Sequence, residues 1–504
     1  PDLSPRPADE KAHLGELQRS LWLAHQMEPR SPAYNLTTAF RVRGGFDVAK
    51  LQRAFNEVVA RHRLLRSTFR VDRGAVHQIV HAHSPLAVEV LEVEDGKGLA
   101  AAIQEARKPF DLETGPLIRL QLIEETSKNE RLLILVLHHI LADERSLGFL
   151  WKELAEAFDG RISDAGPSLQ YDDYVYWLGQ REPAERHHEL DYWRRRLDPL
   201  PDDLRLPFES PALQANEAGA AQGRLLSRRL SPGVQSGVRR LAADTGVTPF
   251  VVFAFAFRLL LHRYTHGQHV AFATPVSTRS HPATANMIGY FLNPVVISTL
   301  VNEEQCVEDA LRGFSRELRD VLTHASVSFQ SLAEELSPPR QRDRHPIFQA
   351  MFVYQETRPP PELGEARFES VALDLGASKF DLTLFVSEGE RSLEVAVEYR
   401  ADRFEELWMH KLLDHYETLL EHLPEDLERS TAELPIMGGQ EQDQLRSYAH
   451  GAEAGKTEMN LLPEQILDQA RRSPESPAVT CGGVRRNYGE LESAARSIAL
   501  ELSA

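Results

Sequence analysis

The spacing of apolar residues changes along the chain, and each spacing predicts a different kind of element. Residues 132–137 form a continuous apolar run flanked by charged residues, as expected for a strand covered on both faces. Residues 48–62 and 146–158 carry apolar residues at helical spacing instead. The first part of the chain is therefore expected to alternate between strands and helices.

A second block of the chain repeats this alternation. Residues 171–197 are rich in aromatic side chains and are expected to be helical, and a proline-rich stretch follows them. The pattern beyond predicts strands at 224–230, 270–276, 295–301, 350–354, 380–386 and 393–399, and helices at 231–246, 248–264 and 403–423. The two blocks predict an α/β fold of two lobes, residues 11–175 and 176–425.

The ends of the chain differ in character from these blocks. Residues 1–10 are interpreted as a linker, and the polar residues 426–455 as a second linker. The tail, residues 456–504, shows a helix that stops at Pro474, then a strand and a final amphipathic helix. About fifty residues bury too little surface for a core of their own, so the tail is either a truncated domain or one docked on the main body.

Composition and charge narrow the class of protein. The formal net charge is −18 over 504 residues, which argues against a nucleic-acid partner, because phosphate binding relies on Lys and Arg. The longest apolar run, residues 250–261, is too short to cross a membrane and contains Arg258, so we expect a buried helix and no membrane partner. Two cysteines are too few for a disulfide framework, and a reducing cytoplasm is the expected location.

The sharpest candidate for chemistry is the pair His138 and His139, directly after the apolar run. Adjacent side chains on a strand face opposite ways, so one imidazole is expected in the core and the other in a cleft. An imidazole titrates near neutrality and can accept or donate a proton. For an isolated pair, a purely structural role is the alternative. No metal site is expected, because adjacent histidines cannot easily chelate one ion and no HExxH helix supports them.

The segment from His138 to Glu144, HHILADE, resembles the HHxxxDG signature of nonribosomal peptide synthetase condensation domains. Five further segments resemble motifs of that family in the same order: Gln18 with Leu21-Trp22, 61–69 (RHRLLRSTF), 171–177 (YDDYVYW), 288–293 (IGYFLN) and 344–348 (RHPIF). Arg63 replaces an acid of the second motif, and His345 replaces an asparagine of the last. Residues 487–491, NYGEL, are similar to the TYxEL motif of adenylation domains, so residues 456–504 are interpreted as the truncated start of such a domain.

This resemblance implies a fold, partners and site residues. The fold would be two chloramphenicol-acetyltransferase-like lobes in a V, with a tunnel between them. Donor and acceptor carrier proteins would bring substrates on 4′-phosphopantetheine arms, with no cofactor bound by the domain itself and an adenylation domain adjacent. The resemblance makes His139 the catalytic histidine and His138 a structural one. Asp143 would be a structural acid, expected to pair with Arg66 or Arg344 beside the active site.

Glu144 stands where the family has glycine, and it leaves two activities open. In the favoured one, the domain dehydrates a Ser- or Thr-derived residue on the donor carrier: His139 removes the Cα proton, and a protonated Glu144 supplies the acid for the departing hydroxyl. In the alternative, Glu144 turns to solvent and the domain forms an ordinary amide bond. His139 then positions the acceptor amine or takes its proton.

Other classes on the same fold fit the sequence less well. An epimerisation domain shares the signature but is not normally followed by an adenylation domain. Heterocyclisation domains carry DxxxxD in place of the histidines, and non-catalytic recruitment modules lose the second histidine. A small-molecule acetyltransferase would not explain the series of motifs or the tail.

Overall fold

The computed structural model describes residues 2–7, 9–45, 47–126, 130–163, 166–180, 183–201, 203–209, 222–338, 344–357, 359–449 and 461–502. The chain divides into two compact units, Pro1–Met437 and Gly438–Ala504. Each unit is described by itself.

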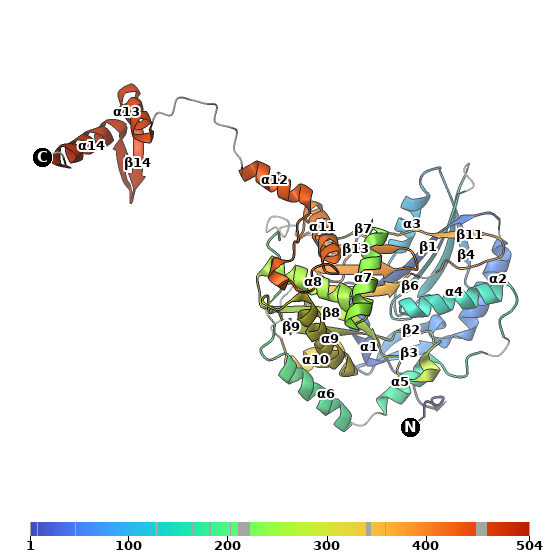
Figure 1. Ribbon diagram of the computed structural model, residues 1–504. Coiled ribbons are helices and arrows are strands. Elements are labelled where there is room, and N and C mark those ends of the chain that lie inside the picture. The colour runs from blue at the N-terminus through green and yellow to red at the C-terminus, as the bar shows by residue number, and fades with distance from the viewer. Residues whose placement is uncertain are drawn as a thin grey trace. The chain divides into compact units, whose positions relative to one another are not determined.

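In the larger unit, strands and helices alternate along the chain (Figure 1). The described strands are β1 (Asn35–Arg43), β2 (Ser67–Asp72), β3 (Ala75–Val80), β4 (Val88–Val93), β5 (Ile118–Glu125), β6 (Arg131–His138), β7 (Gly223–Arg229), β8 (His269–Ser277), β9 (Leu292–Leu300), β10 (Ala350–Glu356), β11 (Arg367–Ser370), β12 (Leu382–Glu388) and β13 (Leu393–Arg400). The described α-helices are α1 (Glu16–Met27), α2 (Val48–Arg61), α3 (Gly98–Arg107), α4 (Glu144–Phe158), α5 (Tyr171–Gly179), α6 (Pro183–Arg196), α7 (Pro232–Thr245), α8 (Pro249–Thr265), α9 (Val307–Thr323), α10 (Phe329–Leu336) and α11 (Glu406–His422).

The predicted elements are confirmed with small shifts at their ends. The segment 171–197, expected to be helical, forms two helices, α5 and α6. The second helix begins at Pro183. Proline has no backbone N–H and is favoured at the first position of a helix, so it starts a new helix more readily than it continues an old one.

The first sheet has five strands in the order β11-β1-β6-β5-β4. β6 lies at its centre, antiparallel to both β1 and β5, and residues 132–137 are all buried. Helices cover both faces of the sheet. On one face, Asn35 donates through Nδ2 to the carbonyl of Ala106 in α3 at 2.7 Å, and on the other, Trp151 of α4 donates through Nε1 to Thr38 at 2.9 Å. This confirms the prediction of a strand buried on both sides.

The second sheet has six strands in the order β7-β13-β12-β10-β8-β9. Neighbouring residues of β10 enter two different cores, because side chains alternate across a strand. Phe352 joins the apolar cluster that also contains residues of α7, α8, α9 and α11, whereas Met351 joins a cluster with residues of α6 and α10. The predicted buried helix is α8. Its Arg258 is 5% exposed, and burial lowers the pKa of this guanidinium to about 10.

Among the residues described, no single helix is long and apolar enough to cross a membrane, although α7 and α8, bent by 106°, meet the length and composition criteria together.

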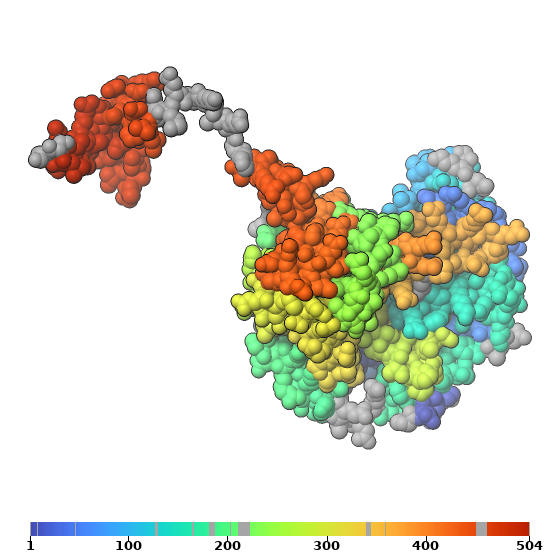
Figure 2. All heavy atoms as spheres, viewed as in Figure 1, coloured from blue at the N-terminus to red at the C-terminus, as the bar shows by residue number. Residues whose placement is uncertain are grey.

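Two segments from the second part of the chain return to the first sheet. β11 pairs antiparallel with β1, with Phe40 opposite Ser370. The residues Met287, Ile288, Tyr290 and Phe291 belong to the apolar cluster of the first sheet. Figure 2 shows the surface of this unit notched between α7, in green, and the blue-to-cyan atoms of the first lobe. The fold is thus a two-lobed α/β structure in which segments from the second part of the chain complete the first lobe. The predicted lobe boundaries at residues 175 and 425 stay predictions.

The smaller unit is described by α12 (Gly439–Ala449), α13 (Leu462–Arg472), β14 (Pro477–Cys481), β15 (Val484–Asn487) and α14 (Tyr488–Leu502). β14 and β15 form an antiparallel hairpin. The predicted order of helix, strand and helix in the tail is confirmed. α12 occupies part of the predicted linker 426–455, and residues 450–460 lie outside the described residues.

Candidate active site

The two histidines at the end of β6, His138 and His139, lie in different surroundings. The ring of His138 packs edge-on against His25, with 5.2 Å between centroids, and its Nδ1 accepts a hydrogen bond from the backbone N–H of Ile140 at 3.1 Å. His138 is 2% exposed. Burial, and to a smaller extent the charges of neighbouring groups, lower its pKa well below the ordinary value. This imidazole is therefore a neutral core group.

His139 is the first residue after β6 and has different neighbours. Its ring meets that of Tyr290 edge to face, with 5.2 Å between centroids, and its backbone N–H donates to the carbonyl of Tyr34 at 2.8 Å. Its Nδ1 lies 2.8 Å from the carbonyl oxygen of Ala142, so Nδ1 carries the hydrogen and Nε2 keeps the lone pair. Burial, and then the charge of Lys379, lower the pKa of His139 to about 3, so this imidazole is neutral at pH 7.

The groups near His139 are reached by solvent and yet enclosed by protein. Lys379 is exposed, and Glu398 and Tyr34 are half-buried. Burial nevertheless lowers the pKa of Lys379, raises the pKa of Glu398, and raises the pKa of Tyr34 to about 12. Side chains that water reaches but cannot fully solvate lie in a recess and not on the outer surface.

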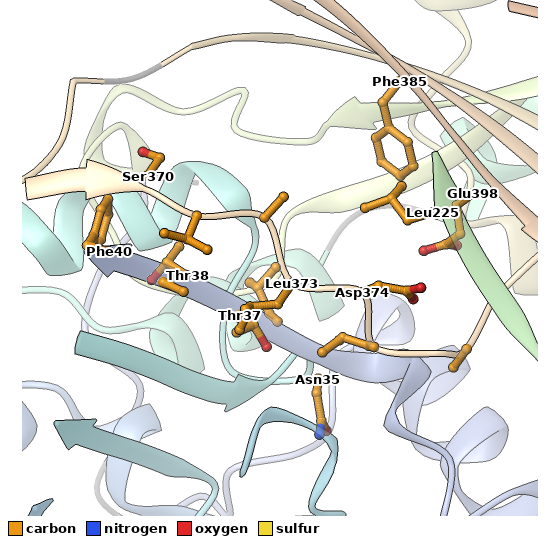
Figure 3. A pocket seen from close by; sticks show the side chains of 16 residues that line it. Asn35, Thr37, Thr38, Phe40, Leu225, Ser370, Leu373, Asp374, Phe385 and Glu398 are labelled. Carbon is orange, nitrogen blue, oxygen red and sulfur yellow. The ribbon is translucent and has the colours of Figure 1, made fainter. Parts of the chain in front are cut away.

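Glu398 also lines a cavity of about 360 Å³ between the two sheets (Figure 3). One wall is β1 with the chain that follows β11, and the other includes Leu225 of β7 and Phe385 of β12. Asp374 and Glu398 lie on the same side of the view in Figure 3. Of Lys379, Glu398 and Tyr34, it is Glu398 that lines this cavity between the lobes.

Glu144 is the first residue of α4 and is half-buried. The charge of its carboxylate raises the pKa of Lys379, and the charge of Lys379 in turn lowers the pKa of His139. The structure thus brings the two predicted catalytic residues, His139 and Glu144, within electrostatic range of one ammonium group. Sequence reasoning missed Lys379, and its only signal was a charged residue directly before the predicted strand 380–386.

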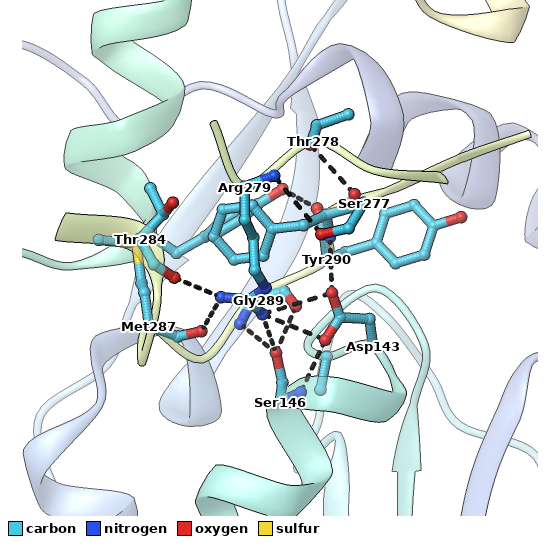
Figure 4. A network of polar contacts seen from close by, with 12 residues as sticks. Asp143, Ser146, Ser277, Thr278, Arg279, Thr284, Met287, Gly289 and Tyr290 are labelled. Carbon is cyan, nitrogen blue, oxygen red and sulfur yellow. Dashed lines mark hydrogen bonds and ion pairs between the residues drawn. The ribbon is translucent and has the colours of Figure 1, made fainter. Parts of the chain in front are cut away.

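Asp143 caps α4 and is paired with Arg279 (Figure 4). Arg279 Nη2 lies 3.1 Å from Asp143 Oδ1, and the side chains are 3% and 1% exposed. The same nitrogen donates to Ser146 Oγ at 2.7 Å, while the second guanidinium nitrogen donates to the carbonyls of Thr284 and Met287 at 2.6 and 2.7 Å. Asp143 is therefore held by a buried cation from the second part of the chain.

The predicted pairing of Asp143 with Arg66 or Arg344 is wrong. Arg66 donates to the carbonyl of His81, and Arg344 pairs with Glu209 and Asp381. Arg279 takes their place because the segment after β8 packs across the first turn of α4. It is the sole Lys or Arg between positions 277 and 291, but local spacing gave no reason to connect it with Asp143.

Other segments singled out in the sequence meet around the same loop. Gln18 donates through Nε2 to the carbonyl of Ile140 at 2.9 Å. Ser146 Oγ and the backbone N–H of Asp143 donate to the carbonyl of Gly289 at 2.8 and 3.1 Å. A Cβ at Gly289 would lie 1.9 Å from the ring of Tyr171, so only glycine fits there.

Arg63, which stands in place of the acid in its motif, has acidic partners. Its Nη2 lies 3.0 Å from Asp172 and 2.8 Å from Asp173, and each carboxylate is 1% exposed. Arg6 also pairs with Asp172, at 3.4 Å. A basic residue at position 63 therefore fits this chain, because two buried carboxylates face it.

Comparison with known proteins gives one consistent result. A family model described as Condensation domain matches residues 8–446. The chain is 30% identical over 523 residues to chondramide synthase cmdD of Chondromyces crocatus, covering 99% of this chain and 13% of that protein. It is 30% identical over 522 residues to phosphinothricin tripeptide synthetase PhsB of Streptomyces viridochromogenes, covering all of this chain (100%) and 44% of that protein. The chain thus spans less than half of either relative.

Solved structures share the fold. A four-domain nonribosomal peptide synthetase bound to AMP and glycine superposes with a TM-score of 0.80 at 23% identity, covering 98% of this chain and 39% of that one. The X-domain from teicoplanin biosynthesis superposes with a TM-score of 0.76 at 25% identity, covering 87% of this chain and 100% of that one.

Proposed function

Since the chain belongs to the condensation-domain family of nonribosomal peptide synthetases, we propose that it forms an amide bond between two substrates tethered as thioesters. The carrier proteins would be a donor and an acceptor, each with a 4′-phosphopantetheine arm. The smaller unit would be the first part of the adenylation domain that follows. The proposal extends to this chain the tripeptide synthesis that the name of one relative states.

The observation that carries this proposal is the state of His139. Its Nδ1–H is held by the carbonyl of Ala142, and its Nε2 keeps a lone pair in a neutral ring. An amine N–H of the acceptor can donate to that lone pair, which turns the amine's own lone pair toward the donor carbonyl. The C–N bond then forms, the C–S bond breaks, and the amine's proton ends on the departing thiol.

A pKa of about 3 suits this role better than the removal of a carbon-bound proton. A general base is most effective when its pKa lies near the working pH, and an imidazole this weak gains little from proton transfer. As an acceptor of a hydrogen bond from an amine, it acts through orientation. For this reason the low pKa of His139 supports amide formation over dehydration, although the sequence alone favours the reverse.

Dehydration of a Ser- or Thr-derived donor is the second candidate, and Glu144 is the observation in its favour. A carboxyl at the start of α4, on the same recess as His139, could serve as the acid for a departing hydroxyl.

The test uses the whole chain with carrier proteins loaded separately. The donor carries a seryl dipeptide, the acceptors carry a panel of aminoacyl groups, and mass spectrometry follows both arms. We expect a tripeptide on the acceptor, loss of at least about 100-fold in rate for His139→Ala, and near-normal rate for Glu144→Gly. Loss of one water from the donor without any acceptor would overturn the proposal in favour of dehydration. An unchanged rate in His139→Ala would overturn both.

A further inference from the structure

We infer that Lys379 is a second catalytic residue, whose ammonium group stabilises the negative charge that develops on the thioester carbonyl oxygen during the reaction. This inference rests on the proposed function, since it assigns a group to the same reaction. It concerns a residue that none of the motifs identified in the sequence contains.

Lys379 lies where the chain crosses between the lobes. Residues 371–381 run from β11 in the first sheet to β12 in the second. The Nζ atom of Lys379 stands 5.6 Å from the ring centroid of Tyr34, whose carbonyl accepts the backbone N–H of His139. The ammonium of Lys379 and the backbone of His139 therefore both lie against Tyr34, which precedes β1.

Charged groups of both lobes face this ammonium. Glu144 comes from the first lobe and Glu398 from the second, and both favour the charged form of Lys379 while burial disfavours it. His138 and His139 are the other titratable groups on which Lys379 acts, and both are neutral. One cation thus faces two carboxylates, whose charges favour its ionised form and partly offset the effect of burial.

The donors of this ammonium remain available. Within the part of the chain that the structure describes, Nζ forms no ion pair within 4.0 Å and no hydrogen bond to a protein group. Lysine offers three N–H donors, and the side chain is exposed. A substrate oxygen that enters the recess can therefore bind to it without displacing a protein partner.

The chemistry requires such a group. When the acceptor nitrogen attacks the donor carbonyl carbon, the π electrons of the C=O bond move to oxygen and form an oxyanion. A cation beside the reacting carbonyl stabilises this charge more than the uncharged ground state. The electrons then return to re-form C=O, the C–S bond breaks, and the thiol leaves with the proton of the amine. Lys379 keeps its own proton throughout.

Binding of a permanent substrate carboxylate is the competing role for the same lysine. The carboxylates of Glu144 and Glu398 already lie within electrostatic range of the Lys379 ammonium and favour its charge. A substrate carboxylate would be bound already in the ground state, whereas the oxyanion exists only at the moment of reaction. The two roles differ in kinetics: loss of substrate binding raises KM, and loss of oxyanion stabilisation lowers kcat.

The kinetic test compares Lys379→Met with Lys379→Arg in the full chain, using the carrier assay described above. We expect Lys379→Met to lower kcat by about 100-fold to 1,000-fold with KM within about threefold, and Lys379→Arg to restore part of the rate. Lys152→Met, at an exposed position of α4 paired with Glu156 at 3.9 Å, is the matched control and should retain full activity. An unchanged kcat in Lys379→Met overturns the inference, and so does a rise in KM alone.

A binding test does not depend on turnover. The probe is a pantetheine analogue in which an anionic phosphonate replaces the thioester carbonyl, so that it mimics the tetrahedral oxyanion. We expect Lys379→Met to weaken its binding at least about tenfold, while Lys152→Met leaves it unchanged. Equal affinities of the wild type and Lys379→Met would overturn the inference. If the wild type binds the probe through Lys379 but forms no amide, the proposed function fails and the assignment of Lys379 as the oxyanion group stands.

Discussion

Arg279 lies 3.1 Å from Asp143 and joins the segment after β8 to the first turn of α4. The loop that follows β6 runs from His139 to Asp143. The ion pair therefore holds the end of this loop, and its cation comes from the second part of the chain. Asp143 also accepts the backbone N–H groups of Ser146 and Phe291, at 2.7 and 3.3 Å. One buried carboxylate therefore binds three different parts of the chain together.

Removing either partner of this pair should destabilise the protein. Asp143→Ala and Arg279→Met each leave one buried charge without its partner, which costs about 3–5 kcal/mol, and urea unfolding at pH 7 measures the loss. Lys97→Met, in an exposed pair with Glu94, should change stability by less than about 0.5 kcal/mol. An Asp143→Ala protein that is inactive but as stable as the wild type would contradict a structural role.

Gly289→Ala should disturb the junction between two motifs. The new methyl group would lie 1.9 Å from the ring of Tyr171, and the ring is 2% exposed, so it has little room to move. We expect a loss of about 3 kcal/mol or more in the free energy of unfolding, since overpacking a closed core costs about 1–3 kcal/mol in milder cases. Gly45→Ala, where a Cβ meets nothing within 4 Å, is the control. Equal stability of the two variants would show that the ring of Tyr171 can move away from the new methyl group.

The buried imidazole of His139 should make stability depend on pH. Its pKa in the folded protein is about 3, below the value of 6.5 for a free histidine. Between these values the unfolded chain binds a proton that the folded chain does not, so stability falls as pH is lowered from about 6.5 toward 3. This one group contributes a slope of up to about 1.4 kcal/mol per pH unit. His139→Gln should show a shallower decline in urea unfolding between pH 7 and 4, and an identical slope would refute the lowered pKa.

Arg63→Glu should be harmful although it restores the acid of the motif. The new carboxylate would face Asp172 and Asp173, both 1% exposed, and would replace the cation that pairs with both of them. We expect a loss of about 3–5 kcal/mol for Arg63→Glu and a smaller one for Arg63→Met, measured by thermal or urea unfolding. Arg53→Glu, at an exposed position of α2, should be nearly neutral. Equal stability of Arg63→Glu and the wild type would mean that the ion pairs contribute nothing.

Sequence periodicity predicted the elements with strong apolar patterns, such as the buried strand β6 and the helix α8. It did not predict β1, whose residues Asn35, Thr37, Thr38 and Arg41 interrupt the apolar pattern. Tertiary contacts account for two of these polar groups, because Asn35 binds α3 and Thr38 binds Trp151. A local pattern does not contain such contacts.

The residues of the candidate site also fall into those that the sequence predicted and those that it did not. The position of His139 after a buried strand followed from the sequence, because a strand end is a local feature. Arg279 and Lys379 did not, since they come from segments 136 and 240 residues beyond Asp143 and His139, at positions 279 and 379 against 143 and 139. Chain crossings between lobes bring them to the site, and single-sequence spacing carries no information on which distant cation meets which carboxylate.

The short strand β11 has a consequence for how the protein can be divided. It covers the outer edge of β1, where residues 367–370 pair with residues 40–43. A fragment cut after residue 175 would lack β11, and the N–H and C=O groups along that edge would be unpaired. An open strand edge is a template for the strand of another molecule. The isolated first lobe should therefore self-associate, and soluble fragments should need the chain through β11.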